Sequence, residues 1–326
     1  MELSIIVPVK DEEASVARFV DHVVPILEAL DDPVASSFEI IFVDDGSGDD
    51  TLPRLADLHA RDARVKAISL SRNFGKEGAL AAGIEHSRGR AVIPIDVDLQ
   101  DDPKAIPAMI SKWREGADIV YGIRANREAD SFSKRMTADL YYRTHNMISS
   151  EKIPMHAGDY RLMDRKVIDV LRSMPERNRF MRGLSTWAGF REEAVEFVRP
   201  DREEGESKYN YRRMWMLAMD GITSSSTLPL RVWSFLGAGI ATLTLLYAAF
   251  IVVRTLIFGR DVPGYASLMV AVLFFGSIQL ISLGVLGEYV GRILVETRRR
   301  PLYIVREGIG IDLDDPRVAR SFDRRL

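Results

Sequence analysis

The chain of 326 residues contains no cysteine. A disulfide framework is therefore impossible, which favours the cytosol for the soluble part of the chain. The formal net charge is only -3, so the overall charge does not indicate a nucleic-acid-binding protein. The length suggests one sizeable domain with an appendage, or two domains.

Common phosphate-binding and metal-binding signatures are also missing. No G-x-G-x-x-G follows the first apolar segment, residues 3–9, which disfavours a dinucleotide-binding dehydrogenase. No G-x-x-x-x-G-K-[ST] occurs, which disfavours a P-loop nucleotidase. The stretch DDGSGDD lacks the spacing and the closing glutamate of an EF-hand. The N-terminus has no basic region and only a short apolar run, so it is not expected to be a signal peptide.

Charged residues are absent from two long segments in the C-terminal third. Residues 232–253 give 22 consecutive uncharged positions, and residues 262–287 give 26. Each segment is long enough for a helix to cross the ~30 Å hydrocarbon core of a bilayer. We expect two transmembrane helices, with a pair of buried helices in a soluble domain as the alternative. Basic residues are more frequent outside the pair than between the helices, so the positive-inside rule places both ends in the cytoplasm.

Apolar and helical segments alternate from the N-terminus onward. The predicted strands are LSIIVPV, FEIIFVDDGS (which ends in carboxylates and a turn), VKAISLS and AVIPIDVD. The first helical segment places Val16, Phe19, Val20, Val23 and Leu27 at helical spacing. Strands that are apolar throughout and alternate with helices predict a mostly parallel α/β sheet with helices on both faces.

Polar residues follow each predicted strand, in PVKDEE, VDDGS, SRNFGK and DVDLQ. Ligand sites of such sheets lie at these carboxyl ends. Asp96 and Asp98 are two residues apart, so both carboxylates of a continuous strand would face one ligand. Mg²⁺ or Mn²⁺, held by these carboxylates and by phosphate oxygens of a substrate, suits the pattern. The alternative is a solvated turn in which the aspartates only cap.

The segment VDDGS ends the second predicted strand. Asp44 is a candidate to accept hydrogen bonds from a nucleobase N–H or from ribose hydroxyls, while Asp45 and Gly46 shape the turn. A turn without any ligand contact is the alternative.

These motifs, in this order, resemble family 2 glycosyltransferases of the GT-A fold. More narrowly, they are similar to polyprenyl-phosphate glycosyltransferases, which include GtrB-type bacterial glucosyltransferases and dolichol-phosphate mannose synthase. The resemblance extends from residue 3 to about residue 300, and it implies a Rossmann-like sheet followed by a two-helix transmembrane hairpin. The segments that carry it are PVKDEE, VDDGSGDDT, SRNFGKEGAL, DVDLQDDP, YGIR, AGDYRLMDRKV and GESKYNYRRM.

The resemblance implies roles for individual residues. Asp96, Asp98 and Gln100 match the metal and diphosphate site, and Asp102 with Pro103 starts the next helix. Lys10 stands where an aromatic residue is common in the family, and Asp11 stands where asparagine is common. The residues implied to bind the nucleotide sugar are Pro8, Lys10, Glu12, Asp44, Lys76, Asp96 and Arg124.

A lipid monophosphate acceptor is implied as well. It is largely ionised at neutral pH, because its second pKa is ~6, and it needs cations more than a strong base. The cations implied to bind it are Lys134 or Arg135, Arg202 and Lys208. Asp159 matches a catalytic aspartate of the family and is expected to act together with Asp98, as a base or by orienting the acceptor. The alternative for Asp159 is a helix cap before RLMDRKVIDVL.

The predicted organisation has three parts. A cytoplasmic catalytic domain occupies residues 1–228, two transmembrane helices (about 232–256 and 264–290) lie within residues 229–290, and a cytoplasmic tail occupies residues 291–326. The first part includes two basic segments with aromatic residues at helical spacing, around Trp187 and Trp215. They are predicted to lie at the membrane surface, with packing against the sheet as the alternative.

The sequence therefore predicts an inverting transferase at the inner (cytoplasmic) membrane of a bacterium. A sugar passes from a nucleotide diphosphate, UDP in preference to GDP, to undecaprenyl phosphate, with Mg²⁺ or Mn²⁺ as cofactor. Analogy with relatives suggests a homotetramer. One alternative is a processive polysaccharide synthase, against which the missing Q-x-x-R-W counts; the other is an inactive, transferase-like membrane binding module, against which the intact carboxylates count.

Overall fold

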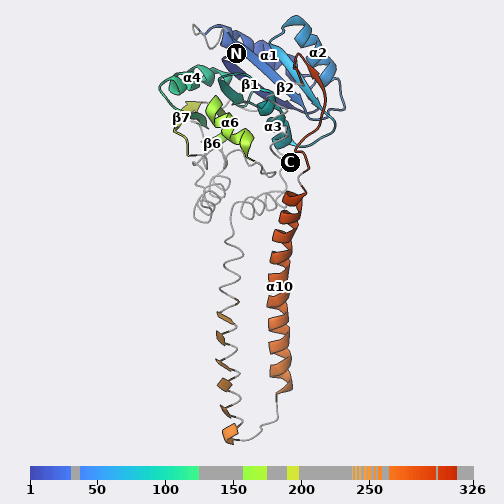
Figure 1. Cartoon of the computed structure of the whole chain (residues 1–326), viewed down its shortest axis with the longest axis vertical. Helices are drawn as coiled ribbons and strands as arrows, with labels where there is room; N and C mark the ends of the chain where they lie inside the picture. Colours follow the sequence, from blue (N-terminus) through green and yellow to red (C-terminus); the bar gives the residue numbers. More distant parts are fainter. Residues whose placement is uncertain are drawn as a thin grey trace. The chain divides into compact units, whose positions relative to one another are not determined.

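The computed structural model describes residues 1–30, 37–124, 157–174, 189–197, 264–298 and 300–313, with scattered positions between 237 and 258. Within these residues one eight-stranded sheet is flanked by helices (Figure 1). The strands are β1 (Leu3–Val9), β2 (Phe38–Asp44), β3 (Val65–Leu70), β4 (Ala91–Pro94), β5 (Ile119–Arg124), β6 (Ala157–Asp164), β7 (Glu192–Phe197) and β8 (Val305–Ile309). The helices are α1 (Ser15–Glu28), α2 (Thr51–Arg61), α3 (Lys76–His86), the 3-10 turn η1 (Pro103–Ala105), α4 (Ile106–Arg114), α6 (Arg165–Ser173) and α10 (Tyr265–Thr297).

The central part of the sheet is parallel. β1 pairs in parallel with both β2 and β4, and β2 pairs in parallel with β3. The strand order is β7-β5-β6-β4-β1-β2-β3-β8, in which β6 and β8 run antiparallel to their neighbours. The predicted fold class, a mostly parallel α/β sheet with helices on both faces, is confirmed. The two antiparallel strands were not predicted from the sequence.

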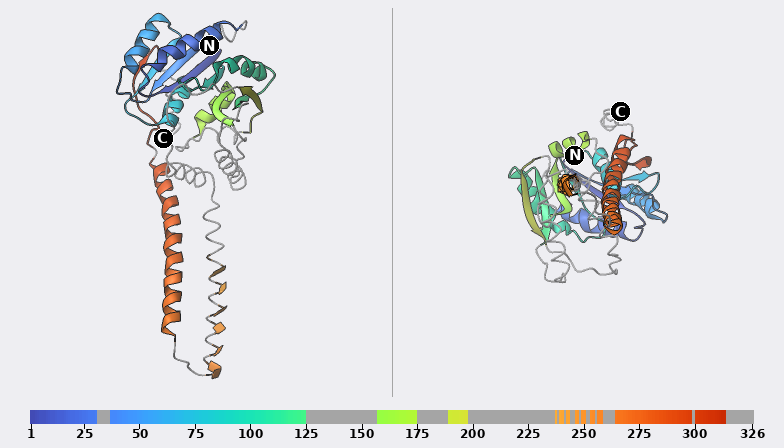
Figure 2. Two further views of the ribbon diagram at one scale, coloured as in Figure 1. Left: turned by 180° about the vertical axis from the view of Figure 1, so that it is seen from behind. Right: turned by 90° about the horizontal axis from the view of Figure 1, so that it is seen from below.

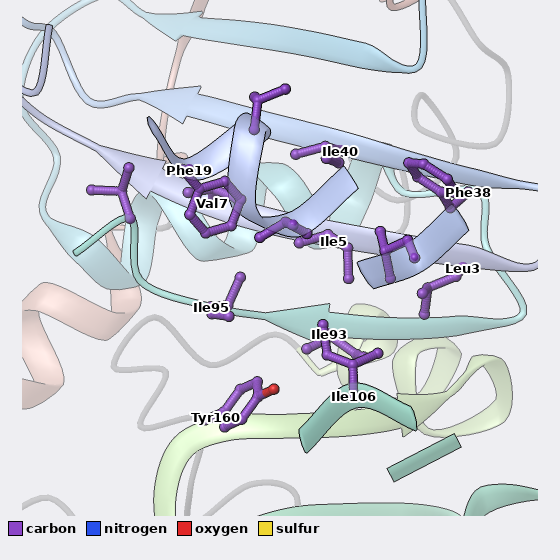
Figure 3. Packing of buried hydrophobic residues seen from close by; sticks show 14 of the residues in the cluster. Leu3, Ile5, Val7, Phe19, Phe38, Ile40, Ile93, Ile95, Ile106 and Tyr160 are labelled. Atoms are coloured by element: carbon purple, nitrogen blue, oxygen red, sulfur yellow. The ribbon is translucent and has the colours of Figure 1, made fainter. Parts of the chain in front are cut away.

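Alternation along the strands produces two separate core layers. Leu3, Ile5 and Val7 of β1 pack with α1, whereas Ile6 packs with α3 on the opposite face of the sheet. Figure 3 shows the first layer, with Phe19 of α1 beside Val7. Burial of a side chain of this size stabilises the fold by about 1.5–3 kcal/mol. The sheet is thus held from both sides, which fixes the positions of the strand ends.

The predicted tail after residue 290 differs from the structure. The helix α10 continues to Thr297, and the chain then returns to the sheet as β8, antiparallel to the edge strand β3. This strand is red in Figures 1 and 2, beside strands from the N-terminal half. Tyr303 is 2% exposed and donates a hydrogen bond from its hydroxyl to buried Glu85 of α3. Residues 300–309 are therefore part of the same folded unit as the sheet rather than a separate tail.

The helix α10 forms part of a second compact unit. Its 33 residues correspond to a length of about 50 Å. Among the described residues, one stretch is long and apolar enough to cross a membrane, Phe274–Thr297, and none of it is buried inside the protein. The predicted second span of about 264–290 begins where α10 begins. Most of the predicted first span lies outside the described residues, as do the two predicted surface helices.

Candidate functional site

An open cleft with a volume of ≈ 370 Å³ lies at the carboxyl ends of β1, β2 and β4 and at the start of α3. Its lining includes Lys10, Asp45, Lys76, Asp96 and Asp98. Parallel strands bring these segments, which are far apart in the sequence, to one edge of the sheet. The size lies within the range of small-molecule sites, and the lining carries charges of both signs.

Asp96 and Asp98 both line the cleft, although the predicted reason for this was wrong. β4 ends at Pro94, so the two aspartates lie in a turn beyond the strand rather than on one strand face. Ile95 and Val97, which alternate with the two aspartates along the chain, are buried, and this burial directs the aspartates outward. Asp98 accepts the backbone N–H of Gln100 at 3.1 Å, and Leu99 between them has a φ of 56°.

Gln100 is not among the residues that line the cleft, and its predicted metal contact stays a prediction. The predicted helix start after it is confirmed. Asp102 accepts the backbone N–H of Lys104 at 3.0 Å, and Pro103 opens the turn η1.

Lys76 and Asp96 form an ion pair in the cleft. The Lys76 Nζ lies 2.6 Å from Oδ1 of Asp96 and 2.7 Å from its Oδ2. The two side chains are 41% and 42% exposed, respectively. Lys76, which the resemblance implied in nucleotide binding, is therefore in direct contact with Asp96, which it implied in metal binding.

Asp44 ends β2 and Asp45 directly follows it, and the two acids differ in exposure to the cleft. Asp44 is 1% exposed and accepts hydrogen bonds from the Ser47 N–H and the Ser69 hydroxyl, both at 2.9 Å. It does not line the cleft, and its predicted contact with the nucleotide stays a prediction. Asp45 is 5% exposed, lines the cleft and accepts the backbone N–H groups of residues 74 and 75 at 2.6 and 2.9 Å.

Asp45 thus holds in place the loop that leads into α3. The sequence interpretation did not assign this role to Asp45. The approach of the two loops is close, because a Cβ built on Gly46 would lie 2.7 Å from the backbone carbon of Arg72. Gly46 also has a φ of 68°, a backbone conformation that residues with a side chain rarely adopt. Asn73 and Gly75 of the same loop line the cleft as well. The polar ending SRNFGK of the third predicted strand was the signal that indicated them.

Lys10, Pro8 and Glu12 also line the cleft, and the nucleotide contact that the resemblance implied for them stays a prediction. The Lys10 Nζ lies 2.7 Å from Oδ2 of Asp11, and this hydrogen bond raises the pKa of Lys10 and lowers that of Asp11. Asp11 has a φ of 55°, and its Oδ1 accepts the backbone N–H of Gly48 at 2.8 Å. Glu12 accepts the Ser15 hydroxyl at 2.5 Å.

Two predicted residues are described in backbone position only. Arg124 ends β5, and Asp159 lies inside β6, which pairs with β5. The alternative of a helix cap for Asp159 is wrong, because the cap of α6 is Asp164, which accepts the backbone N–H of Lys166. The predicted phosphate-binding residues lie outside the described residues: Lys134, Arg135, Arg202 and Lys208.

The donor atoms of the cleft fit a hard divalent cation. Among the described residues, no three aspartate, glutamate or histidine side chains converge as a metal site. The cleft offers the carboxylates of Asp96 and Asp98, and Mg²⁺ commonly binds one or two carboxylates together with water and substrate phosphates. Asp96 and Asp98 are the residues that would hold such an ion if phosphate oxygens completed its coordination.

Comparison with known proteins gives matches over most of the chain. Glycosyl transferase family 2 matches residues 4–172, and the GtrB C-terminal hairpin matches residues 228–293. An uncharacterized glycosyltransferase of Synechocystis sp. is 48% identical over 312 residues, 96% of this chain and 97% of the relative. A bactoprenol glucosyl transferase of Shigella phage SfV is 47% identical over 306 residues, 94% and 98% of the two chains. A prophage bactoprenol glucosyl transferase homolog of Escherichia coli is 45% identical over 306 residues, 94% and 99% of the two chains.

Proposed function

Because the chain belongs to glycosyl transferase family 2, as its motifs indicated, we propose that it transfers a sugar from a nucleotide diphosphate to a polyprenyl phosphate at the cytoplasmic face of a membrane. The observation that carries the proposal is the cleft in which Lys76, Asp96 and Asp98 meet at the carboxyl ends of the parallel strands. Of the three relatives described above, one is named a bactoprenol glucosyl transferase and another a homolog of such an enzyme, and bactoprenol is a polyprenol. The apolar α10 supplies a surface for a membrane. UDP is the preferred nucleotide and undecaprenyl phosphate the preferred acceptor.

The proposed reaction is a direct displacement. An oxygen of the acceptor phosphate forms a bond to the anomeric carbon, and the bond from this carbon to the donor diphosphate breaks, with inversion. The acceptor phosphate is already ionised at neutral pH. A divalent cation, Mg²⁺ or Mn²⁺, supplies neutralisation of the departing diphosphate when it is bound. Asp159 is proposed to orient the acceptor or take a proton, and Arg124, Lys134, Arg135, Arg202 and Lys208 to bind phosphate groups.

A transfer assay tests this proposal with the full chain in detergent. Undecaprenyl phosphate, Mg²⁺ or Mn²⁺ and a panel of labelled UDP- and GDP-sugars should yield one chloroform-soluble product that carries a single sugar. Asp98→Asn should lower the rate on the order of 100-fold, as removal of one charge-stabilising group does in other active sites. Asp102→Asn is the matched control, since Asp102 caps η1 and does not line the cleft, and it should retain most of the activity.

Two results would contradict the proposal. One is the absence of a lipid-linked product across the whole sugar panel. The other is an Asp98→Asn variant that works as fast as the wild type. A polymeric product in place of a single-sugar lipid would instead indicate a processive synthase.

A further inference from the structure

Lys76 occupies a helical position that is unfavourable for a lysine. It is the first residue of α3, and this helix begins without a side-chain cap. The amino end of a helix carries a partial positive charge, so a cation is destabilising there and an anion is stabilising. A residue that breaks a local preference of this kind is most often placed for function. Lys76 also lines the cleft, where such a function would act.

The positive charge of Lys76 is balanced by Asp96, which lies 20 residues further along the chain, in the turn after β4. The ammonium group lies within 2.7 Å of both carboxylate oxygens of Asp96. A divalent cation would use the same oxygens. Asp96 and Asp98 are the two neighbouring carboxylates in the turn after β4, and no larger group of metal-binding side chains occurs among the described residues. An ammonium group and a divalent cation cannot occupy the same two oxygen atoms at these distances.

We propose that Lys76 takes the place of the divalent cation on Asp96 until a nucleotide diphosphate binds, and that Lys76 then moves to the diphosphate. The inference rests on the proposed function, because it concerns the same cleft. Diphosphate oxygens offer Lys76 a new anionic partner and offer the cation the ligands that two carboxylates do not provide. Metal and nucleotide therefore bind cooperatively, and metal alone binds weakly.

The cooperativity is reciprocal by thermodynamic linkage. If UDP raises the affinity for Mn²⁺ by some factor, Mn²⁺ raises the affinity for UDP by the same factor. In the wild type, part of this factor arises because the diphosphate releases Asp96 from Lys76. Removal of the ammonium group should make Mn²⁺ alone bind more tightly and make UDP bind less tightly, so the two affinities should change in opposite directions.

The experiment compares Lys76→Met with the wild type, using the full chain in detergent. Free Mn²⁺ is measured by electron paramagnetic resonance, with and without UDP. Without UDP, Lys76→Met should bind Mn²⁺ about two- to fivefold more tightly, which is the range set by one partly exposed ion pair. With UDP, the Mn²⁺ affinity should rise less than in the wild type. The affinity for UDP without metal should fall severalfold.

Two further variants serve as controls. Lys112→Met removes the same charge from an ion pair between α4 and Glu115, the residue after that helix, away from the cleft, and should leave both affinities unchanged. Lys76→Arg keeps the charge and should retain the wild-type pattern. If Lys76→Met fails to fold, as thermal unfolding would reveal, Lys76→Gln makes the same comparison with a polar side chain.

The outcomes separate this inference from the proposed function. Unchanged or weaker Mn²⁺ binding by Lys76→Met without UDP, in a protein whose wild type binds Mn²⁺ together with UDP, would overturn the inference alone. A wild type that binds neither Mn²⁺ nor UDP would overturn the proposed function as well.

Discussion

Replacement of Asp45 by asparagine tests how the loop before α3 is held in place. Asp45 is buried, and each of its carboxylate oxygens accepts one backbone N–H, from Phe74 at 2.6 Å and from Gly75 at 2.9 Å. An amide retains one acceptor and presents an NH₂ group to the other N–H. One charge-assisted hydrogen bond is then lost, and two donors face each other in a buried place.

The expected cost follows from these contacts. Loss of a partner for a buried group costs about 1–3 kcal/mol. The Gly75 N–H also contacts the Asn73 Oδ1 at 2.9 Å, so turning the amide NH₂ toward Gly75 leaves that N–H one acceptor. We therefore expect about 2 kcal/mol. For a folded unit of roughly 150–250 residues this lowers the melting temperature by about 4–8 °C.

The neighbouring variant Asp44→Asn is the matched control. Asp44 is equally buried, but one of its two partners is the hydroxyl of Ser69, which can accept as well as donate. An asparagine can keep its oxygen on the Ser47 N–H and donate its NH₂ to Ser69. The cost should stay below about 1 kcal/mol.

Thermal unfolding of the full-length variants in detergent, followed by fluorescence, gives both values under one condition. The argument from hydrogen-bond partners would be refuted if the two variants lost the same stability, or if Asp44→Asn lost more.

Two other predictions concern the edges of the fold. Tyr303→Phe removes one hydrogen-bond donor from the buried carboxylate of Glu85 and should lower the free energy of unfolding by about 1–3 kcal/mol. Glu85→Gln keeps an acceptor for the Tyr303 hydroxyl and should cost less. Equal melting temperatures for Tyr303→Phe and the wild type would count against a structural role of residues 300–309. The hydrogen bond from Arg64 lowers the pKa of Asp62 below the 3.8 of a free aspartate. A depressed carboxyl pKa gives stability that is present above the unfolded pKa and is lost as the pH falls through the folded pKa. The difference in free energy of unfolding between wild type and Arg64→Met, measured by urea unfolding, should therefore become smaller on going from pH 7 to below pH 3.8. A difference that stays constant would contradict this.

The parallel core of the sheet could be predicted from the sequence, because its strands are apolar on both faces. The run LSIIVPV coincides with β1, and the predicted segment FEIIFVDDGS begins where β2 begins, with its last three residues lying beyond the strand. The edge strand β8 could not be predicted in this way. Its sequence, VREGI, has exposed charged residues and a glycine, and its place in the sheet is set by long-range pairing with β3.

The cleft was predictable in outline for a similar reason. A parallel sheet gathers the carboxyl ends of its strands, so polar endings that are distant in the sequence converge. The alternation of Ile95, Asp96, Val97 and Asp98 indicated correctly that both acids face one side. The alternation arises from burial of the two apolar residues and not from a continued strand. Which of two adjacent acids lines the cleft, Asp44 or Asp45, depends on contacts with Ser69 of β3 and with residues 74 and 75 of the loop after it, and periodicity contains no information on such contacts.

Under the proposed function, the charges of the cleft favour a metal–nucleotide complex as its ligand over either component alone. Both lysines that line it have an aspartate at hydrogen-bond distance, Lys10 with Asp11 and Lys76 with Asp96. A diphosphate that entered alone would compete with these aspartates for the lysines and would lie near Asp98. A divalent cation that entered alone would have to displace an ammonium group from Asp96. A diphosphate that arrives with its cation would give Lys10 and Lys76 an anionic partner and would give Asp96 and Asp98 a cationic one, which neither component does alone.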